Sequence, residues 1–188
     1  MNAPLSQVIL NTPHALQHVS TKWDNDIVRQ LTDYIAVPAK SPMFDPDWAQ
    51  HGYIDAVVRN AANWVQAQQV AGLKLEVIRL PGRTPVLFFE IPASSGVTEN
   101  RAANLLSESV EGASSSTVLM YGHLDKQPEF SGWRSDLGPW TPKYQDGKLY
   151  GRGGADDGYA VYAAVAAVQA VQAQGAAHPR IVGLIETS

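Results

Sequence analysis

The chain has 188 residues, no cysteine and a formal net charge of −4 at pH 7. A chain of this length can bury one proper hydrophobic core, and its 45% hydrophobic and 17% charged residues are typical of a globular protein. Without cysteine there are no disulfides or thiolate metal sites, so any bound metal ion must use histidine and carboxylate ligands. The mild acidity, with no evident basic face, argues against a nucleic-acid partner.

The N-terminal residues give no sign of a targeting or membrane segment. Residues 1–20 contain no Lys or Arg and no long apolar core, so they do not have the pattern of a signal peptide. No apolar stretch of the sequence approaches the roughly 20 residues that span a bilayer. We therefore expect a cytoplasmic protein with no membrane partner.

Two helices are predicted in the first part of the chain, after a loose or short-helical lead-in over residues 1–20. Asp24 is predicted to cap the first helix, whose apolar residues recur at helical spacing as far as Tyr34. The second helix is predicted over residues 47–71, and Gly72 is its expected C-terminal stop.

Strand patterns follow the second helix. Residues 73–80 alternate between apolar and charged side chains and residues 85–91 are mostly apolar, so the two segments predict a β-hairpin. Residues 93–116 are rich in Ser, Gly and Glu and are expected to form a surface loop with one helical turn. Residues 117–121 (TVLMY) are short and apolar, which predicts a strand buried on both faces.

A long loop, a helix and a strand are predicted in the last third of the chain. The loop covers residues 126–147, and its Trp133 and Trp140 either anchor it or line a substrate pocket. The helix is predicted over 159–174 and the strand over 180–186. Strands that alternate with long helices indicate an α/β fold. The final strand is apolar and is expected to need neighbours on both sides, or to leave an unpaired edge.

The first chemically informative motif lies where the strand over residues 117–121 ends. His123 and Asp125 are separated by one residue, and positions i and i+2 of an extended segment point the same way. Asp125 can therefore accept the second ring N–H of His123, which fixes the tautomer and increases the basicity of the outward-facing nitrogen. The alternative is a histidine that is satisfied in the core or at the surface.

The second motif is the segment 151–158 (GRGGADDG), which opens the predicted helix over 159–174. Glycines allow the backbone to turn tightly and to approach a site closely. Asp156 and Asp157 place two adjacent carboxylates near the helix start, where they either cap the helix or bind a cation. Phosphate binding is disfavoured, because adjacent carboxylates repel an anion and the segment is neither a Walker loop nor a GxGxxG turn.

Together these motifs resemble the co-catalytic zinc peptidases, a family that includes carnosine dipeptidases, aminoacylases, succinyl-diaminopimelate desuccinylases and glutamate carboxypeptidases. The resemblance lies in YGHLDKQP (121–128), KLYGRGGADDG (148–158) and IVGLIETS (181–188), and it covers residues 24–188. It implies a three-layer α/β/α fold with a central mixed sheet. Residues 1–188 would form the N-terminal part of a metallopeptidase catalytic domain, truncated and without the family's lid or dimerisation domain.

The resemblance also assigns roles to individual residues. It implies that His123 binds one metal ion, that Asp156 bridges two, and that Asp125 acts in catalysis by orienting His123. The implied cofactors are two divalent ions, with zinc expected and manganese or cobalt as alternatives, since histidine and carboxylate suit several ions. The glycines of residues 151–154 would shape the loop.

Two positions depart from the family pattern and concern the substrate class rather than metal binding. After Asp156 the family usually has Lys-Gly or Met-Lys-Gly, whereas this chain has Asp157, Gly158 and Tyr159. Lys126 stands where an apolar residue is usual.

The family also has a Glu-Glu pair, which follows the strand that corresponds to residues 180–186. The first glutamate of the pair is the general base and the second is a metal ligand. Glu186 lies just before that place and is expected to be neither of them. Because these groups and the later ligands are expected beyond Ser188, we expect the 188 residues alone to be inactive or very weakly active.

The expected function is hydrolysis of a peptide or related amide bond in a small peptide, with a water activated between two metal ions. One alternative is an amidase or deacylase of N-acyl amino acids that uses the same metal centre. Another is a degenerate relative that binds a ligand without catalysis. The sequence gives no basis for an oligomeric state.

Overall fold

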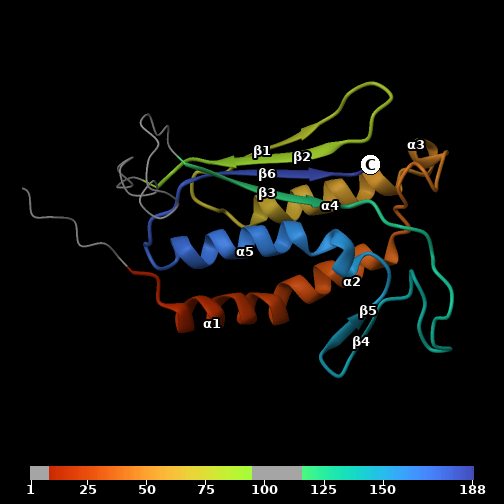
Figure 1. Ribbon diagram of the computed structural model, residues 1–188, viewed down its shortest axis with the longest axis horizontal. Helices are drawn as coiled ribbons and strands as arrows, with labels where there is room; N and C mark the ends of the chain where they lie inside the picture. The colour runs from red at the N-terminus through yellow and green to blue at the C-terminus, as the bar shows by residue number, and fades with distance from the viewer. Residues whose placement is uncertain (1–8, 95–115) are drawn as a thin grey trace, which may run out of the picture.

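The structure is a computed structural model, and it describes residues 9–94 and 116–188. Figure 1 shows a β-sheet with helices stacked beneath one of its faces. The surface loop expected over residues 93–116 lies, apart from its two ends, outside the described residues.

The sheet has four strands in the spatial order β1 (Lys74–Ile78), β2 (Val86–Ile91), β6 (Arg180–Glu186) and β3 (Thr117–His123). The predicted hairpin is confirmed, since β1 and β2 pair in antiparallel fashion. β2 is also antiparallel to β6, whereas β3 and β6 run parallel. The predicted mixed sheet of an α/β fold is therefore confirmed.

The position of β3 differs from its prediction. The strand lies at one edge of the four-stranded sheet, with Leu119 61% exposed and Tyr121 57% exposed, so it is not buried on both faces. The final strand β6 has a neighbour on each side, as its apolar sequence predicts, and β1 and β3 are the two edges of the sheet among the described residues. The apolar composition of residues 117–121 identified a strand, but strand order depends on pairing with distant segments.

The N-terminal region forms one long helical element. α1 (Thr12–Lys22) continues through a single π-helical turn, η1 (Trp23–Ile27), into α2 (Val28–Ala36). The prediction that Asp24 caps a helix is therefore wrong, because this residue lies inside the continuous element. The helix begins instead at Asn11, whose side-chain oxygen accepts a backbone N–H of the first turn.

The predicted helix over residues 47–71 is divided in two. α3 (Trp48–His51) ends at Gly52, which has φ +69°, and α4 (Tyr53–Ala67) begins directly after it. A left-handed glycine ends a helix by turning the backbone out of the helical path, which explains the break. Gly72, also left-handed, lies beyond the end of α4 in the turn that leads to β1.

The long loop after β3 carries a short hairpin formed by β4 (Lys143–Gln145) and β5 (Lys148–Tyr150). A helical turn, η3 (Gly154–Gly158), then leads into α5 (Ala160–Gln172), which confirms the helix predicted from the Ala- and Val-rich segment. Trp133 donates its indole N–H to the Glu129 carbonyl, a contact that fits the anchoring role proposed for the loop tryptophans.

The hydrophobic core lies between the sheet and the helices α4 and α5, and the α1–α2 element packs on the outer side of α5 (Figure 1). Side chains along β2 and β6 alternate between buried and half-buried, which shows that one face of the sheet is packed. Gly183 lets the Phe89 ring lie directly on the sheet, since a Cβ there would be 2.1 Å from the ring. Within the described residues, helices cover this face alone, so the second helical layer of the expected three-layer fold is not among them.

Across the two described stretches of the chain, no helix combines the length and the apolarity needed to cross a membrane.

Candidate metal centre

The candidate site lies at the carboxyl ends of β3 and β6, at the right-hand end of the sheet in Figure 1. Because the two strands run parallel, their last residues His123 and Glu186 are register partners. Leu124 continues the pairing by donating its N–H to the Glu186 carbonyl at 2.9 Å. The buried Leu124 side chain then anchors the chain as it leaves the sheet, so His123 stands on a rigid support.

Asp125 is 2% exposed and lies against the His123 ring. Its carboxylate Oδ1 and its carbonyl oxygen are each 3.1 Å from His123 Nδ1. The ring therefore donates its Nδ1–H to Asp125 and points Nε2 outward. This is the orientation that the one-residue spacing predicts.

Asp156 is brought to the open side of the same imidazole. Its Oδ1 is 3.3 Å from His123 Nε2, and its side chain is 59% exposed. The neighbouring Asp157 points differently, because a hydrogen bond from the backbone of His123 holds its carboxylate against β3. The alternative that the two aspartates cap α5 is wrong, since Tyr159 occupies the cap position and no side chain caps it.

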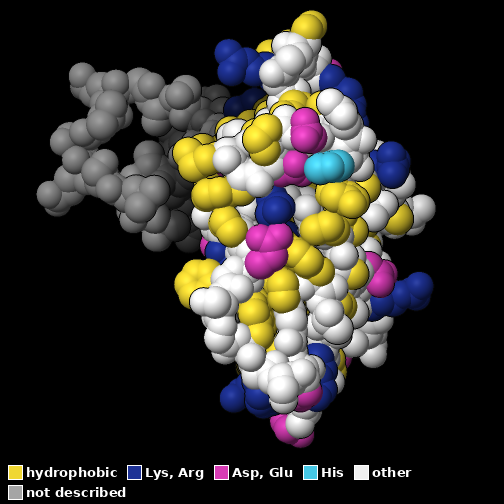
Figure 2. Space-filling view, turned by 90° about the vertical axis from the view of Figure 1, so that its right-hand side faces the viewer, with side chains coloured by type: hydrophobic (Ala, Val, Ile, Leu, Met, Phe, Trp, Pro, Cys, Tyr) yellow, Lys and Arg dark blue, Asp and Glu magenta, His cyan; other side chains and the backbone are white. Residues whose placement is uncertain are grey.

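Figure 2 shows the end of the molecule at which β3 and β6 finish. Acidic, basic and hydrophobic side chains are interspersed over this face, and no field of one sign dominates it. Any preference of the site for a cation must therefore come from the few carboxylates close to His123, rather than from a wide charged surface.

Glycines allow the loop that carries Asp156 to lie directly on α2. A Cβ at Gly158 would be 2.2 Å from the Tyr34 ring, and a Cβ at Gly151 would be 2.2 Å from the Ile35 side chain. Any larger residue at either position would force the loop away from the helix. The glycine-rich pattern thus shapes the approach of the two carboxylates to the end of β3.

The charges of the site shift the pKa values of its members. Burial acts to lower the pKa of His123, but the nearby carboxylates of Asp125, Asp157 and Asp156 outweigh it and raise this pKa. Burial raises the pKa of Asp125, and the His123 ring opposes that shift. Burial likewise raises the pKa of Asp157. The carboxylates thus form a cluster that favours a positive charge at the imidazole.

The Glu186 carboxylate accepts hydrogen bonds from two neighbouring residues. Tyr121 donates its hydroxyl to Glu186 Oε1 at 2.9 Å, and the backbone N–H of Ser188 donates to Oε2 at 2.6 Å. Both carboxylate oxygens are thus hydrogen-bonded, and the expectation that this glutamate is not a general base stays a prediction.

The sequence patterns did not identify Lys126 as part of the site's support. Its side chain is 0% exposed, and its ammonium donates to the carbonyls of Tyr34 and Val37, each at 2.6 Å, and of Ile35 at 3.3 Å. The ammonium also lies 4.0 Å from the centre of the Tyr34 ring, and its stem packs against Gly153. A lysine at a position that is usually apolar was the available signal, because it predicts burial with a hydrogen-bonding partner.

The residues fit a divalent ion in part. An imidazole nitrogen opposite a carboxylate oxygen is a donor set that zinc, manganese and cobalt accept, and the Asp125 contact orients the histidine for it. Within residues 9–94 and 116–188, no three His, Asp or Glu side chains form a complete ligand set. His123 and Asp156 are thus two members of a candidate centre.

The profile of Peptidase family M20/M25/M40 matches residues 119–188, the segment that contains both motifs. The resemblance inferred from the motifs is therefore confirmed, and it is a resemblance to a metallopeptidase family.

Solved structures support the same fold. Human carnosine dipeptidase 1 is similar with 26% identity and a TM-score of 0.64, covering 93% of this chain and 34% of that chain. A di-peptidase from Saccharomyces cerevisiae gives a TM-score of 0.63 at 20% identity, with the same coverage, and supports the fold alone.

Two curated relatives match over shorter stretches. Beta-Ala-His dipeptidase of Mus musculus is 54% identical over 43 residues, which are 22% of this chain and 8% of that protein. Succinyl-diaminopimelate desuccinylase of Cupriavidus taiwanensis is 34% identical over 98 residues, which are 50% of this chain and 25% of that protein. The chain thus matches a quarter or less of the length of these curated relatives.

Proposed function

We propose that residues 1–188 form the N-terminal part of the catalytic domain of a metal-dependent hydrolase that cleaves peptide bonds in small peptides. The observation that carries the proposal is the His123 imidazole, held by Asp125 on one nitrogen and opposed by Asp156 on the other. Similarity to dipeptidases in both sequence and fold supports the substrate class.

In this proposal His123 and Asp156 would hold the metal, and Asp156 would serve two divalent ions, with zinc expected. Two such ions would polarise the substrate carbonyl and lower the pKa of a water molecule. Asp125 keeps the Nδ1 proton on His123 and so keeps Nε2 available as a ligand. The glycine-rich loop holds Asp156 at the end of β3.

The proposal does not assign a general base among these residues. Glu186 is hydrogen-bonded by Tyr121 and Ser188, and the 188 residues contain no Glu-Glu pair after β6. We therefore propose that these residues alone turn over substrate weakly or not at all. The cytoplasmic location expected from the sequence stays a prediction.

A second candidate function is the hydrolysis of N-acyl amino acids at the same centre. The similarity to a succinyl-diaminopimelate desuccinylase, which extends over half of this chain, favours it. The two functions use the same metal ligands and differ in the acyl group of the substrate. A panel of dipeptides and N-succinyl or N-acetyl amino acids separates them.

The test begins with the reading frame around the Ser188 codon and with the polypeptide that it encodes. That polypeptide is assayed with Zn²⁺ or Mn²⁺ against the substrate panel, as wild type and as the His123→Ala and Asp156→Asn variants. We expect each variant to lose at least about 100-fold in activity. Loss of a residue that only orients a metal ligand costs about 10–100-fold, and loss of a ligand itself should cost at least the upper value. The matched control Asp146→Asn removes a carboxylate of the β4–β5 turn and should keep activity.

Two results would contradict the proposal. One is wild-type activity in the His123→Ala variant, which would remove the histidine from the centre. The other is robust turnover by the 188 residues alone, which would show that they already contain a general base and a complete ligand set.

A further inference from the structure

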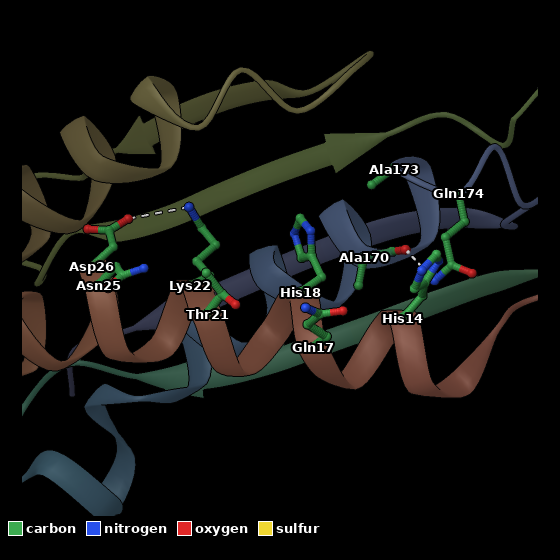
Figure 3. Close-up of a pocket in the computed structure, with 10 residues that line it drawn as sticks. All are labelled: His14, Gln17, His18, Thr21, Lys22, Asn25, Asp26, Ala170, Ala173 and Gln174. Carbon is green, nitrogen blue, oxygen red and sulfur yellow. Dashed lines mark hydrogen bonds and ion pairs between the residues drawn. The ribbon is translucent and has the colours of Figure 1, made fainter.

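A groove far from the candidate centre runs between α1 and α5. It has a volume of about 580 Å³, and its walls are polar side chains of α1 facing the C-terminal turns of α5. Figure 3 shows the rings of His14 and His18 standing on the side of α1 that faces α5. These are two of the five histidines in the sequence, and neither takes part in the proposed function.

The spacing of the two histidines matters. His14 and His18 are four residues apart within one α-helix, so they lie one turn apart on the same face, with Cβ atoms about 5–6 Å from each other. Two imidazoles at this spacing on a helix are a metal-binding arrangement, because both can reach one ion without a change of backbone. The helix is 11 residues long and is capped by Asn11, so the pair stands on a formed element.

A second observation concerns His18 alone. Its Nε2 atom is shielded from solvent and has no hydrogen-bond partner among the described residues. A shielded ring nitrogen without a partner costs free energy, which a ligand in the groove would recover.

The other groups in the groove decide which ions fit. Its acidic side chain, Asp26, is bound by Lys22 at 3.3 Å and by the Trp64 indole at 3.0 Å, so it is not a free carboxylate ligand. Gln174 donates to Ala170 and accepts from Asn11. The two imidazoles are the nitrogen donors of the groove, and Gln17, Thr21 and Asn25 add only neutral oxygens. Imidazoles suit zinc, nickel and copper, whereas magnesium and calcium prefer several oxygen ligands that include carboxylates.

We propose that His14 and His18 form a second metal site on α1, selective for transition-metal ions that prefer imidazole. The site is independent of the proposed function, because it shares no residue with His123, Asp125 or Asp156. It has two protein ligands, so the remaining coordination positions belong to solvent.

The test measures metal binding rather than activity. The tag-free chain carrying His123→Ala and Asp156→Asn, which remove the candidate centre, is titrated calorimetrically with Zn²⁺ and Ni²⁺. We expect about one equivalent of each ion to bind. Adding His14→Ala or His18→Ala should weaken the affinity for the metal ion at least about tenfold. Even the loss of a residue that only orients a ligand lowers metal affinity by about this factor.

The matched control is His51→Ala, which also removes one imidazole but from the end of α3, where the ring contacts Asp45. This variant should bind as the parent does, and Mg²⁺ and Ca²⁺ should give no binding. The proposal would be overturned if the variants without His14 or His18 bound the metal ion as tightly as the parent does. It would also be overturned if His51→Ala weakened metal binding. Because His14 is exposed, the His14→Ala variant tests the site even if His18→Ala disturbs the packing on α5.

Discussion

Replacing the buried Lys126 by methionine should remove a specific pH dependence of stability. The ammonium is enclosed by the C-terminal carbonyls of α2 and by the Tyr34 ring, and the stem of the side chain packs against Gly153. Burial lowers the pKa of Lys126 from 10.5 to about 7, while the carbonyls and the ring favour the charged form and oppose the shift. Methionine has a similar length and no charge, so Lys126→Met removes the titration and keeps most of the packing.

The sign and the size of the effect follow from linkage. Between about pH 7 and 10.5 the unfolded chain holds a proton on Lys126 that the folded chain has released, so folded stability rises with pH in this range. The difference between 10.5 and about 7 corresponds to at most about 5 kcal/mol, at 1.36 kcal/mol for each pKa unit. Between pH 7.5 and 9.5 the free energy of unfolding of the wild type should rise by about 2–3 kcal/mol relative to Lys126→Met.

The assay is urea unfolding of wild type, Lys126→Met and the matched control Lys40→Met at pH 7.5, 8.5 and 9.5. Lys40 contacts Glu129 from a half-buried position, so its removal should leave the slope with pH unchanged. A wild-type curve parallel to that of Lys126→Met would refute the reasoning, because it would show that the ammonium keeps its ordinary pKa when buried.

Three further predictions concern the site and the fold. Asp125→Asn should lower the pKa of His123, followed by NMR titration of the ring protons, because it removes the carboxylate that most favours the charged imidazole; an unchanged pKa would contradict the contact. Gly183→Ala should destabilise the fold by about 1–3 kcal/mol, since its Cβ would strike the Phe89 ring; urea unfolding that matches wild type would contradict this packing. Asn11→Ala should cost about 1 kcal/mol of stability through loss of the α1 cap, whereas Asn11→Gly should cost only a few tenths.

The parts of the fold that the sequence predicted depend on local patterns. The β1–β2 hairpin, α5 and β6 have periodicity and turn residues that specify them without reference to the rest of the chain. The positions at which helices continue or break could not be predicted from local patterns in the same way. Asp24 has the side chain of a cap but continues a helix through a π-helical turn, and Gly52 interrupts a segment whose apolar spacing runs across it.

The same distinction holds for the candidate site. The contact between His123 and Asp125 follows from their spacing along an extended segment, so it was predictable. The approach of Asp156 to the other ring nitrogen requires the loop after β5 to return to the end of β3. The resemblance to the zinc peptidases implied this approach, and among the local patterns only the glycines indicated it. The edge position of β3 and the burial of Lys126 depend on contacts between distant segments, which no local pattern specifies.

Lys126 also connects the elements that carry the site. It follows Asp125 directly in the chain, its backbone N–H donates to the Ala39 carbonyl, and its side chain is bound to the end of α2 and packed against Gly153. A displacement of α2 would therefore move the segment that orients His123 and the loop that carries Asp156 together. In this chain the N-terminal helical element is thus part of the site's support, because one buried ammonium joins its C-terminus to both motifs.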